Sequence, residues 1–469
     1  MYRLFRFSIR KRYVILTAIS ALLLLSYFLP PSFGLNLVQQ RTLFLLIISI
    51  VIWTTDVLPS GISALFVIGL ELFMGIAENF STAIQGFMSS TIYFILIVAL
   101  ISATMTKVGI DKRLAAIIVR FSHGKIRRVA LSFFTATMVL PVFIPSGNAR
   151  VHMFVPLVEQ IGQQYGPQAR IPFQRFTIWT LGGINQLATM VVLSGGGLAV
   201  LASQLVAELN VQLNWLTWFL FMAPPIWLTC ILTGLIMWNY WKIKEIPSLP
   251  SHPASETGSH DRHPHFWLVT VSLIGLILAW VVVPEFHVSI LLPPLLLLGI
   301  LAMPGIDLLN NRDLRNYDWE NFLVLGTALS LAAIIEKNGT ADWVTGVILS
   351  FVGQHLPNWL YLLVLLVIVL FIRMMFTSPA AALTVIYPLV KSYADWVGLN
   401  PLHTLLLTIL VASGMLILPI HSPIMYLVYR TGHIKIGEHL FISTVQLFFT
   451  IIVGLCAYMW YWPLVTAHH

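Results

Sequence analysis

Long apolar runs recur along the whole chain, and they constrain its fold more than any other feature of the sequence. A membrane-spanning helix needs about 20 mainly apolar residues, because about 30 Å of hydrocarbon must be crossed. Charged residues make up only 9% of the chain, too few to keep a folded surface of this size hydrated. The sequence therefore excludes a water-soluble protein and predicts an all-α polytopic membrane protein.

We expect about eleven membrane spans, each of roughly the length that a bilayer requires. They cover residues 13–30, 41–58, 60–77, 91–106, 176–206, 215–241, 266–283, 288–304, 320–336, 403–430 and 439–464. A cytoplasmic N-terminus puts most Lys and Arg residues on the cytoplasmic side and the C-terminus outside, as the positive-inside rule requires. The formal net charge of +8 is thus explained by orientation in an inner or plasma membrane, and membrane lipids rather than nucleic acid are the expected partners.

A polar segment rich in Ser, Pro and His, residues 247–264, separates two apolar halves. Such a composition is typical of a flexible connection. The expected parts are a cytoplasmic segment with the first span (1–38), a first repeat (39–245), a cytoplasmic linker (246–265) and a second repeat (266–469).

Two apolar stretches, 130–165 and 357–398, carry prolines and small polar residues near their middles. Ser146, Ala149, Pro156, Leu157 and Val158 recur with the same spacing as Ser378, Ala381, Pro388, Leu389 and Val390. Five spans per repeat predict an inverted repeat, the symmetry of many secondary transporters. Non-helical backbone at membrane depth is tolerated only beside protein or water, so each stretch is predicted to be a re-entrant hairpin lining a cavity. Helix N-termini at the hairpin tips favour an anionic substrate.

Four blocks of residues resemble the divalent anion/sodium symporter (DASS) family. They are Trp53–Pro59, Trp319–Glu320 with Leu325–Leu329, Ala412–Pro423 with Thr431–Ile436, and the hairpin motifs Ser146–Ala149 and Ser378–Ala381. The resemblance implies a homodimeric secondary active transporter that moves a dicarboxylate, sulfate or related oxyanion by an elevator-type mechanism, coupled to sodium. The sequence contains no H-E-x-x-H motif of a zinc enzyme and no phosphate-binding loop of an ATP-driven pump, so its motifs indicate neither class.

The family writes Ser-Asn-Thr-Ala in both hairpins, whereas this chain keeps both serines and loses both threonines. The predicted substrate-binding residues are Ser146, Gly147, Asn148, Arg150, Ser378, Pro379, Ala380, Ser422 and Pro423. Candidates for ion coupling are Asn148, Gly183, Asn185, Thr189, Ser378, Ala412 and His421, and candidates for proton coupling are His152, His421 and Asp56. The family's T-P-P-N motif has become Ser422-Pro423-Ile424-Met425 in the second half, and its first copy falls around Gly182–Gln186, without a proline.

Arg150 follows the first hairpin motif, and an unpaired guanidinium at membrane depth is costly. It either pairs with an anionic substrate, or forms a structural ion pair, or reaches the cytoplasm. Arg373, before Ser378, poses the same alternatives, and the histidines could be neutral packing residues. No cofactor is expected other than Na⁺ or H⁺. The open alternatives are a proton-coupled or exchange-type transporter that uses Arg150 as counter-charge, an anion channel, and a membrane-embedded enzyme.

Overall fold

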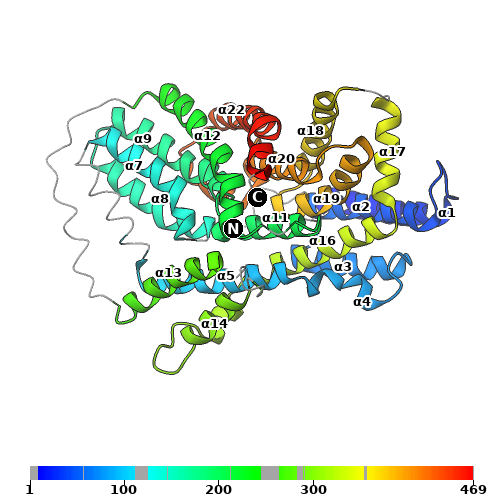
Figure 1. Ribbon diagram of the computed structural model, residues 1–469, viewed down its shortest axis with the longest axis horizontal. Coiled ribbons are helices and arrows are strands. Elements are labelled where there is room, and N and C mark those ends of the chain that lie inside the picture. The colour runs from blue at the N-terminus through cyan, green and yellow to red at the C-terminus, as the bar shows by residue number, and fades with distance from the viewer. Residues whose placement is uncertain are drawn as a thin grey trace. The chain divides into compact units, whose positions relative to one another are not determined.

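The computed structural model describes residues 9–55, 57–110, 113, 125–144, 146–211, 213–243, 263–282, 289, 291–352 and 356–467 (Figure 1). These residues are almost entirely helical and include no strand. Asp56, most of the basic stretch 107–128 and most of the linker 246–265 lie outside the described residues. The all-α polytopic fold is confirmed, because long apolar helices dominate the described chain.

Five of the described helices are long and apolar enough to cross a membrane. They are Leu37–Thr55, Ser90–Lys107, Trp215–Trp241, Trp319–Lys337 and Ile436–Ala467. Seven further apolar helices have between 10 and 17 residues, including Phe266–Trp280 and Asn358–Met374. The number of eleven spans therefore stays a prediction.

The chain forms two compact units, each assembled from two separate stretches of sequence. The first unit comprises Met1–Ile92 and Asp318–Leu405, and the second comprises Tyr93–Tyr317 and Leu406–His469. Each unit draws on both predicted repeats, and the predicted repeat boundaries stay a prediction.

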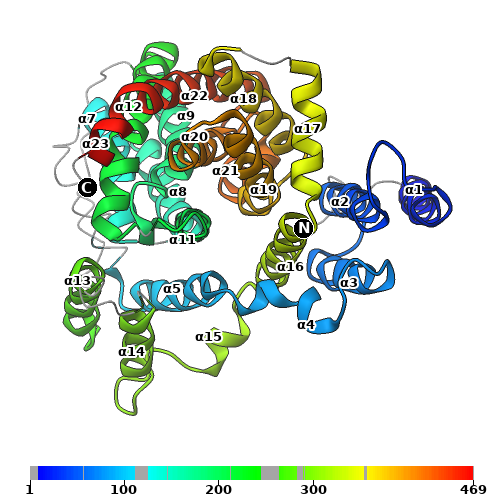
Figure 2. The same cartoon turned by 45° about the vertical axis from the view of Figure 1, so that its right-hand side comes forward.

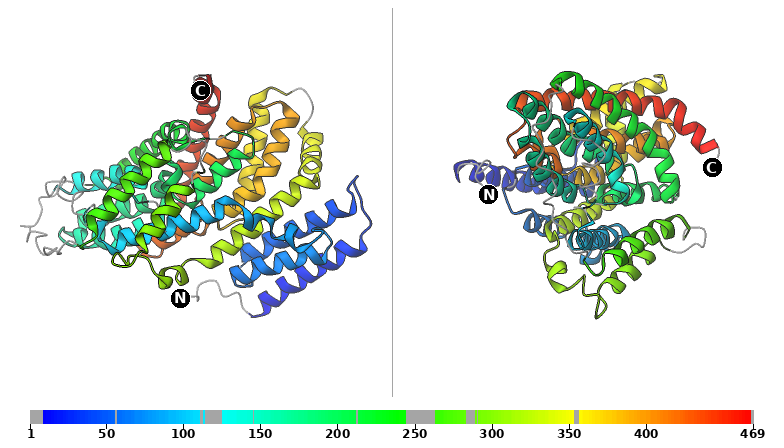
Figure 3. Two further views of the ribbon diagram at one scale, coloured as in Figure 1. Left: turned by 60° about the horizontal axis from the view of Figure 1, so that its bottom comes forward. Right: turned by 90° about the vertical axis from the view of Figure 1, so that its left-hand side faces the viewer.

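In the first unit, helix α16 (Trp319–Lys337) packs against α3 (Ser60–Phe73), the 3-10 turn η1 (Gln85–Met88) and α19 (Pro379–Val397). The approach to η1 is close because a Cβ atom on Gly86 would overlap the backbone of Gly326 and Ser330. The Gly86 amide donates to Ser330 Oγ at 2.9 Å. The other helices of this unit are α1 (Ile9–Phe28), α2 (Leu37–Thr55), α4 (Phe80–Ala83), α17 (Thr340–Val352) and α18 (Asn358–Met374), and Figure 3 shows α1 to α3 in blue, side by side.

In the second unit, the long helix α12 (Trp215–Trp241) packs against α22 (Ile436–Cys456), which continues into α23 (Trp462–Ala467) (Figure 2). The other α-helices are α7 (Ile126–Val139), α8 (Gly147–Gln163), α9 (Pro167–Trp179), α10 (Asn185–Ala188), α11 (Gly197–Ala207), α13 (Phe266–Val282), α14 (Leu292–Leu301), α15 (Asn311–Arg315) and α21 (Pro423–Tyr429). Helices α5 (Ser90–Lys107) and α20 (Pro401–Gly414) begin in the first unit and end in the second.

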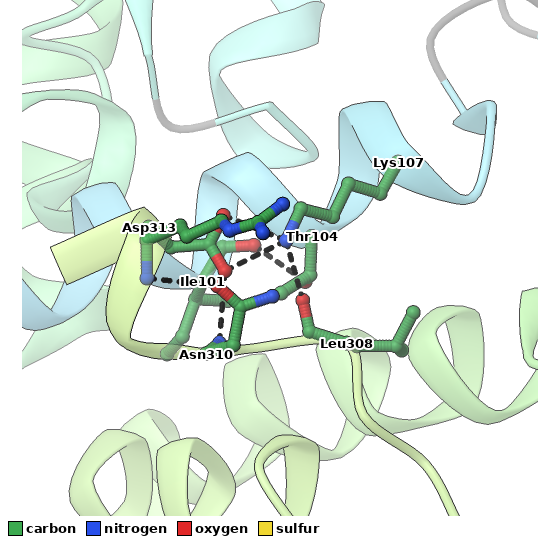
Figure 4. A network of polar contacts seen from close by, with 7 residues as sticks. Ile101, Thr104, Lys107, Leu308, Asn310 and Asp313 are labelled. Carbon is green, nitrogen blue, oxygen red and sulfur yellow. Dashed lines mark hydrogen bonds and ion pairs between the residues drawn. The ribbon is translucent and has the colours of Figure 1, made fainter. Parts of the chain in front are cut away.

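One charged cluster fixes the end of α5 to the polar segment around α15 (Figure 4). Lys107 Nζ lies 2.6 Å from Asp313 Oδ1 and donates to the Leu308 carbonyl at 2.8 Å. The Asn310 amide donates to Asp313 Oδ2 at 2.9 Å, which completes a capping box. This cluster fixes the polar segment around α15 to the end of α5, and no residue of either hairpin takes part in it.

Both predicted hairpins are helix–break–helix segments, so neither is an unbroken rod. The first, α7 to α8, breaks at Ser146, and the second, α18 to α19, breaks at Ser378. The helices begin at corresponding residues, Ile126 and Asn358, then Gly147 and Pro379, with the same separation of 232 residues that relates the two serines. The repeated sequence motif thus corresponds to a repeated local structure.

Two of the expected spans, 176–206 and 403–430, are each interrupted in the structure. In the first, α10 ends at Ala188 and α11 begins at Gly197; in the second, α20 ends at Gly414 and α21 begins at Pro423. A short 3-10 turn lies at the same place in each break, Leu193–Gly195 and Pro419–His421. We call residues 189–196 the first break and residues 415–422 the second break.

Around Gly182–Gln186, where the first copy of the family's T-P-P-N motif was expected, the backbone continues through a π-helical turn, Thr180–Ile184, into α10. The first break begins at Thr189, directly after α10, and glycine rather than proline permits it. A Cβ atom on Gly195 would overlap the Thr189 carbonyl, so this tight turn requires glycine.

Candidate functional site

The tip of the first hairpin begins with an N-capping serine. Ser146 Oγ accepts a hydrogen bond from the Ala149 amide at 3.2 Å, so the serine starts α8. Ser378 Oγ accepts from the Ala381 amide at 3.4 Å in the same way and starts α19. An N-cap of this kind satisfies one of the free amides of a helix start and leaves others available to an anion.

Arg150 is buried inside the second unit, with 1% of its surface exposed. Its Nη1 donates to the Ile144 carbonyl, and its Nε donates to Asn185 Oδ1 at 2.6 Å. Within the described part of the chain, Nη2 has no hydrogen-bond partner and the guanidinium has no carboxylate partner. Two neutral oxygens compensate a buried positive charge only in part, and an uncompensated charge costs several kcal/mol.

Asn185 connects the hairpin tip to α10. Its side chain is fully buried, and its Nδ2 donates to the Gly147 carbonyl at 3.0 Å while its Oδ1 accepts from Arg150. Both ends of the amide are therefore occupied, as buried polar groups require. This one side chain fixes the hairpin tip and the arginine to the same helix.

The second break reaches the same place through Ser422. Its Oγ donates to Gln186 Oε1 at 2.7 Å, and Thr189 Oγ1 donates to the Gln186 carbonyl at 2.6 Å. A Cβ atom on Gly147 would overlap Ile424 and crowd Thr189, so the hairpin tip touches both broken helices. The first hairpin tip, the first break and the second break therefore converge at one site, which we call the first half-site.

The structure brings together part of the predicted set. Ser146, Gly147, Arg150, Asn185, Thr189 and Ser422 lie at the first half-site. Asn148 and Pro423 border it with exposed side chains, and the side chain of His152 is also exposed.

The remaining ion-coupling candidates lie inside neighbouring helices or turns. A Cβ atom on Gly183 would meet the ring of Trp179, and Ala412 is buried inside α20. His421 is buried in the second break, where its Nδ1 accepts from the Leu418 amide at 3.3 Å.

Gln186 and Ile424 also lie at the first half-site, and neither was among the predicted site residues. Gln186 could have been predicted, because the apolar run 176–206 holds two consecutive amide side chains, Asn185 and Gln186. A buried amide within an apolar helix must find hydrogen-bond partners. Ile424 could not have been predicted, since it is one of many aliphatic residues.

The second hairpin carries a half-site of its own in the first unit. A cavity of about 180 Å³ lies against its tip. Its lining residues are Trp53, Ser60, Ser63, Asp318, Glu320, Asn321, Val324, Phe376, Thr377, Ser378 and Ala381. Three of the four family-like blocks thus meet at one polar cavity, but two carboxylates at its edge disfavour a free anion there.

Arg373 is fully buried beside this tip. Its Nη1 donates to the Phe376 carbonyl at 2.6 Å. It comes from α18, before the break, whereas Arg150 comes from α8, after the break.

The two hairpins and the two interrupted helices are typical of one class of membrane protein, the transporters that bind substrate at discontinuous helices. The chain matches the family model described as the sodium:sulfate symporter transmembrane region over residues 10–467. It therefore belongs to the divalent anion/sodium symporter family, as its motifs indicated. It is an integral membrane transporter and not an enzyme.

Its relatives are distant in sequence. The sodium-dependent high-affinity dicarboxylate transporter 3 of Caenorhabditis elegans is 25% identical over 450 residues, covering 84% of this chain and 78% of that protein. The citrate/succinate antiporter of Escherichia coli K12 is 20% identical over 370 residues, covering 76% and 75%. The solved structure of the Alcanivorax borkumensis YdaH transporter is similar in fold, with a TM-score of 0.56 at 16% identity over 81% of this chain and 88% of that one.

The family description implies a sodium ion, and the oxygen atoms at the hairpins are the candidates to bind it. The Ile144 and Phe376 carbonyls each accept from a guanidinium, and Asn185 Oδ1 accepts from Arg150 as well. A sodium ion at these oxygens would lie beside a fixed positive charge, and two unit charges about 4 Å apart repel by about 4 kcal/mol at an effective dielectric constant of about 20. These particular oxygens therefore do not fit a sodium ion.

Proposed function

We propose that this chain is a secondary active transporter of a small anion, either a dicarboxylate or sulfate or a related oxyanion. One observation carries the proposal: Arg150 is buried without a carboxylate partner among the described residues, and its Nη2 is unsatisfied. An oxyanion supplies both the missing charge and the missing acceptor, and charge-assisted bonds of this kind are among the strongest that a protein makes.

The substrate would lie at the first half-site. Ser146, Gly147 and Asn148 form the start of α8, whose free amides favour an anion, and Arg150 supplies the counter-charge. Ser422 and Pro423 border the same site from the second break. The contribution of Ser378, Pro379 and Ala380 to substrate binding stays a prediction.

An elevator-type movement is the mechanism that we propose. Asn185 ties the first hairpin to α10, and Ser422 ties α10 to the second break, all within the second unit. Elements linked by buried hydrogen bonds move together more readily than they separate, because separation would leave polar groups unpaired. A substrate held there would cross with the elements that bind it.

Exchange is the coupling mode that Arg150 favours. An empty site would carry the uncompensated guanidinium through the membrane, whereas a loaded site would carry it neutralised by the substrate. The loaded form therefore crosses at lower cost, and uptake of one anion requires release of another.

Sodium coupling is the second candidate. It is favoured by the family description and by the printed name of the C. elegans relative. Proton coupling through His421, His152 or Asp56 is the third, since an imidazole changes charge near neutral pH.

Reconstitution into liposomes tests these proposals together. Uptake of radiolabelled sulfate, succinate and citrate would be measured with an inward sodium gradient, an inward proton gradient, or internal unlabelled anion. We expect saturable uptake that internal anion stimulates. Conductance without saturation would instead indicate a channel and would overturn the proposed function.

Two further features go with this proposal. The family resemblance suggests a homodimer, which cross-linking in native membranes would test. The distribution of positive charge suggests a cytoplasmic N-terminus and an external C-terminus, which labelling of single cysteines placed at each end would test.

A further inference from the structure

We propose that Arg373 is the counterpart of Arg150 in the second hairpin, and that each arginine is a fixed cation in the place of a metal ion at its hairpin. The inference rests on the proposed function, because it concerns how the same transporter compensates charge. It assigns a role to Arg373 and predicts that anion exchange by this chain needs no sodium.

The inference depends on a backbone carbonyl at the same position of each hairpin, which accepts a hydrogen bond from a buried arginine. Arg150 donates to the carbonyl of Ile144, and Arg373 donates to the carbonyl of Phe376. Each of these residues lies two positions before the capping serine of its hairpin, Ser146 or Ser378. The same carbonyl of each hairpin therefore receives a buried guanidinium.

The two arginines reach that carbonyl from opposite directions. Arg150 lies four residues after its capping serine, on α8, and Arg373 lies five residues before its own, on α18. A repeated sequence position cannot explain the shared contact, because the positions differ. The common factor is a positive charge at one place in each hairpin.

The chemistry of this place explains the requirement. The carbonyl belongs to the segment that follows the end of the first hairpin helix, where backbone acceptors lack helical partners and carry partial negative charge. A cation satisfies such an acceptor best, and both arginines are buried to within 1% of complete burial. A guanidinium fixed by the chain makes a mobile cation unnecessary there and repels one that approaches.

The experiment measures anion exchange by the full-length protein in liposomes loaded with unlabelled substrate. Wild-type exchange is expected to be equal, within about twofold, in sodium, potassium and choline salts. Arg373→Gln is expected to lower exchange at least about tenfold, because it removes a charge-assisted hydrogen bond and the charge itself. Arg373→Lys, which keeps the charge, is expected to retain most of the exchange.

Arg41 offers a matched control. It lies in the same unit, and its Nη1 donates to the Met74 carbonyl at 2.8 Å, outside both hairpins. Arg41→Gln removes a bond of the same type and is expected to leave exchange within about twofold of wild type.

A readout other than rate separates a charge role from a structural one. Adding guanidinium salt is expected to restore part of the exchange lost in Arg373→Ala, because a small cation can enter the space left by the side chain. If Arg373→Gln fails to fold, as judged by size-exclusion profile, Arg373→Lys decides: folded and active supports the inference, folded and inactive overturns it.

The failures are distinguishable. Wild-type exchange that requires sodium, or wild-type rates in folded Arg373→Gln, would overturn the fixed-cation inference and leave anion transport intact. Absence of saturable anion transport in every salt would overturn the proposed function instead.

Discussion

The two hairpins share their breaks, their capping serines and the carbonyl that binds an arginine, yet they take that arginine from opposite arms. In the first hairpin it follows the break, on α8, and in the second it precedes the break, on α18. The constraint is therefore on where the positive charge lies in space and not on its place in the motif. A comparison of aligned motifs alone would pair Arg150 with Ala382 and miss Arg373.

The surroundings of the two tips also differ. The first tip is packed against Asn185 and, through Gly147, against Ile424. The second lines a cavity that Asp318 and Glu320 border. Carboxylates repel an anion and buried amides do not, so the first tip is the better candidate for direct contact with substrate. The variants below test this difference.

The largest effect is expected at Arg150. Arg150→Ala should abolish saturable anion uptake, with a loss of about 100-fold or more, because hydrogen bonds to charged groups contribute about 1.5–3 kcal/mol each. Uptake of labelled substrate into liposomes is the measurement, at matched protein content. The expression level should not fall, and Arg41→Ala is the control. Normal uptake by Arg150→Ala would remove this residue from the site and weaken the contrast between the tips.

Gly147 should tolerate alanine less well than its counterpart Pro379 does. A Cβ atom at position 147 would overlap the terminal methyl of Ile424, a side-chain end that can shift, so Gly147→Ala should lower exchange by a few fold, in line with the lower limit of about 1 kcal/mol for overpacking. Exchange assays on Gly147→Ala and Pro379→Ala give the comparison.

The contact itself can be tested by relieving it. Combining Gly147→Ala with Ile424→Ala should restore part of the lost exchange. If the single and double variants are equally impaired, the contact with Ile424 is not the cause.

The local structure of the hairpins could be predicted because it depends on short-range chemistry. A serine followed mainly by small residues gives an N-capped helix in both copies. The family motifs then supplied the class of protein. These signals lie within a few residues of one another, which is the range over which a single sequence can be read reliably.

The broken helices and the centre of the site could not be predicted in the same way. The first break depends on Gly195 and has no proline, and an apolar run gives no periodic signal that separates one long helix from two short ones. The bond between Ser422 and Gln186 joins residues 236 positions apart. Which carbonyl receives Arg373 depends on how two helix arms pack, and no spacing in the sequence records it.

A smaller effect is expected from the capping serines, and it compares the two tips directly. Ser146→Ala and Ser378→Ala should each destabilise the protein by about 1 kcal/mol, the usual cost of losing an N-cap. Thermal unfolding in detergent should therefore shift equally for both. Only Ser146→Ala should also raise the KM for the anion, by a few fold, because that tip contacts substrate in our proposal. An equal rise for both serines would mean that the second tip also binds the anion.

The smallest effect is expected at Asp313, which lies outside both hairpins and serves as a reference for them. Desolvation raises the pKa of Asp313, but hydrogen bonds from Lys107 and Asn310 outweigh it and hold the pKa below its ordinary value of 3.8. A carboxyl with a lowered pKa in the folded state stabilises fully above its ordinary pKa and loses that contribution as pH falls through the lowered value. Asp313→Asn should therefore lower the free energy of unfolding at pH 7 by less than about 1 kcal/mol, since Lys107 is partly exposed. The unfolding temperature should fall slightly as a result. The difference from wild type should vanish in strongly acidic detergent solution, and anion exchange at pH 7 should be unchanged. A loss of exchange as large as that of a hairpin variant would show that transport depends on the α15 segment as well as on the hairpins.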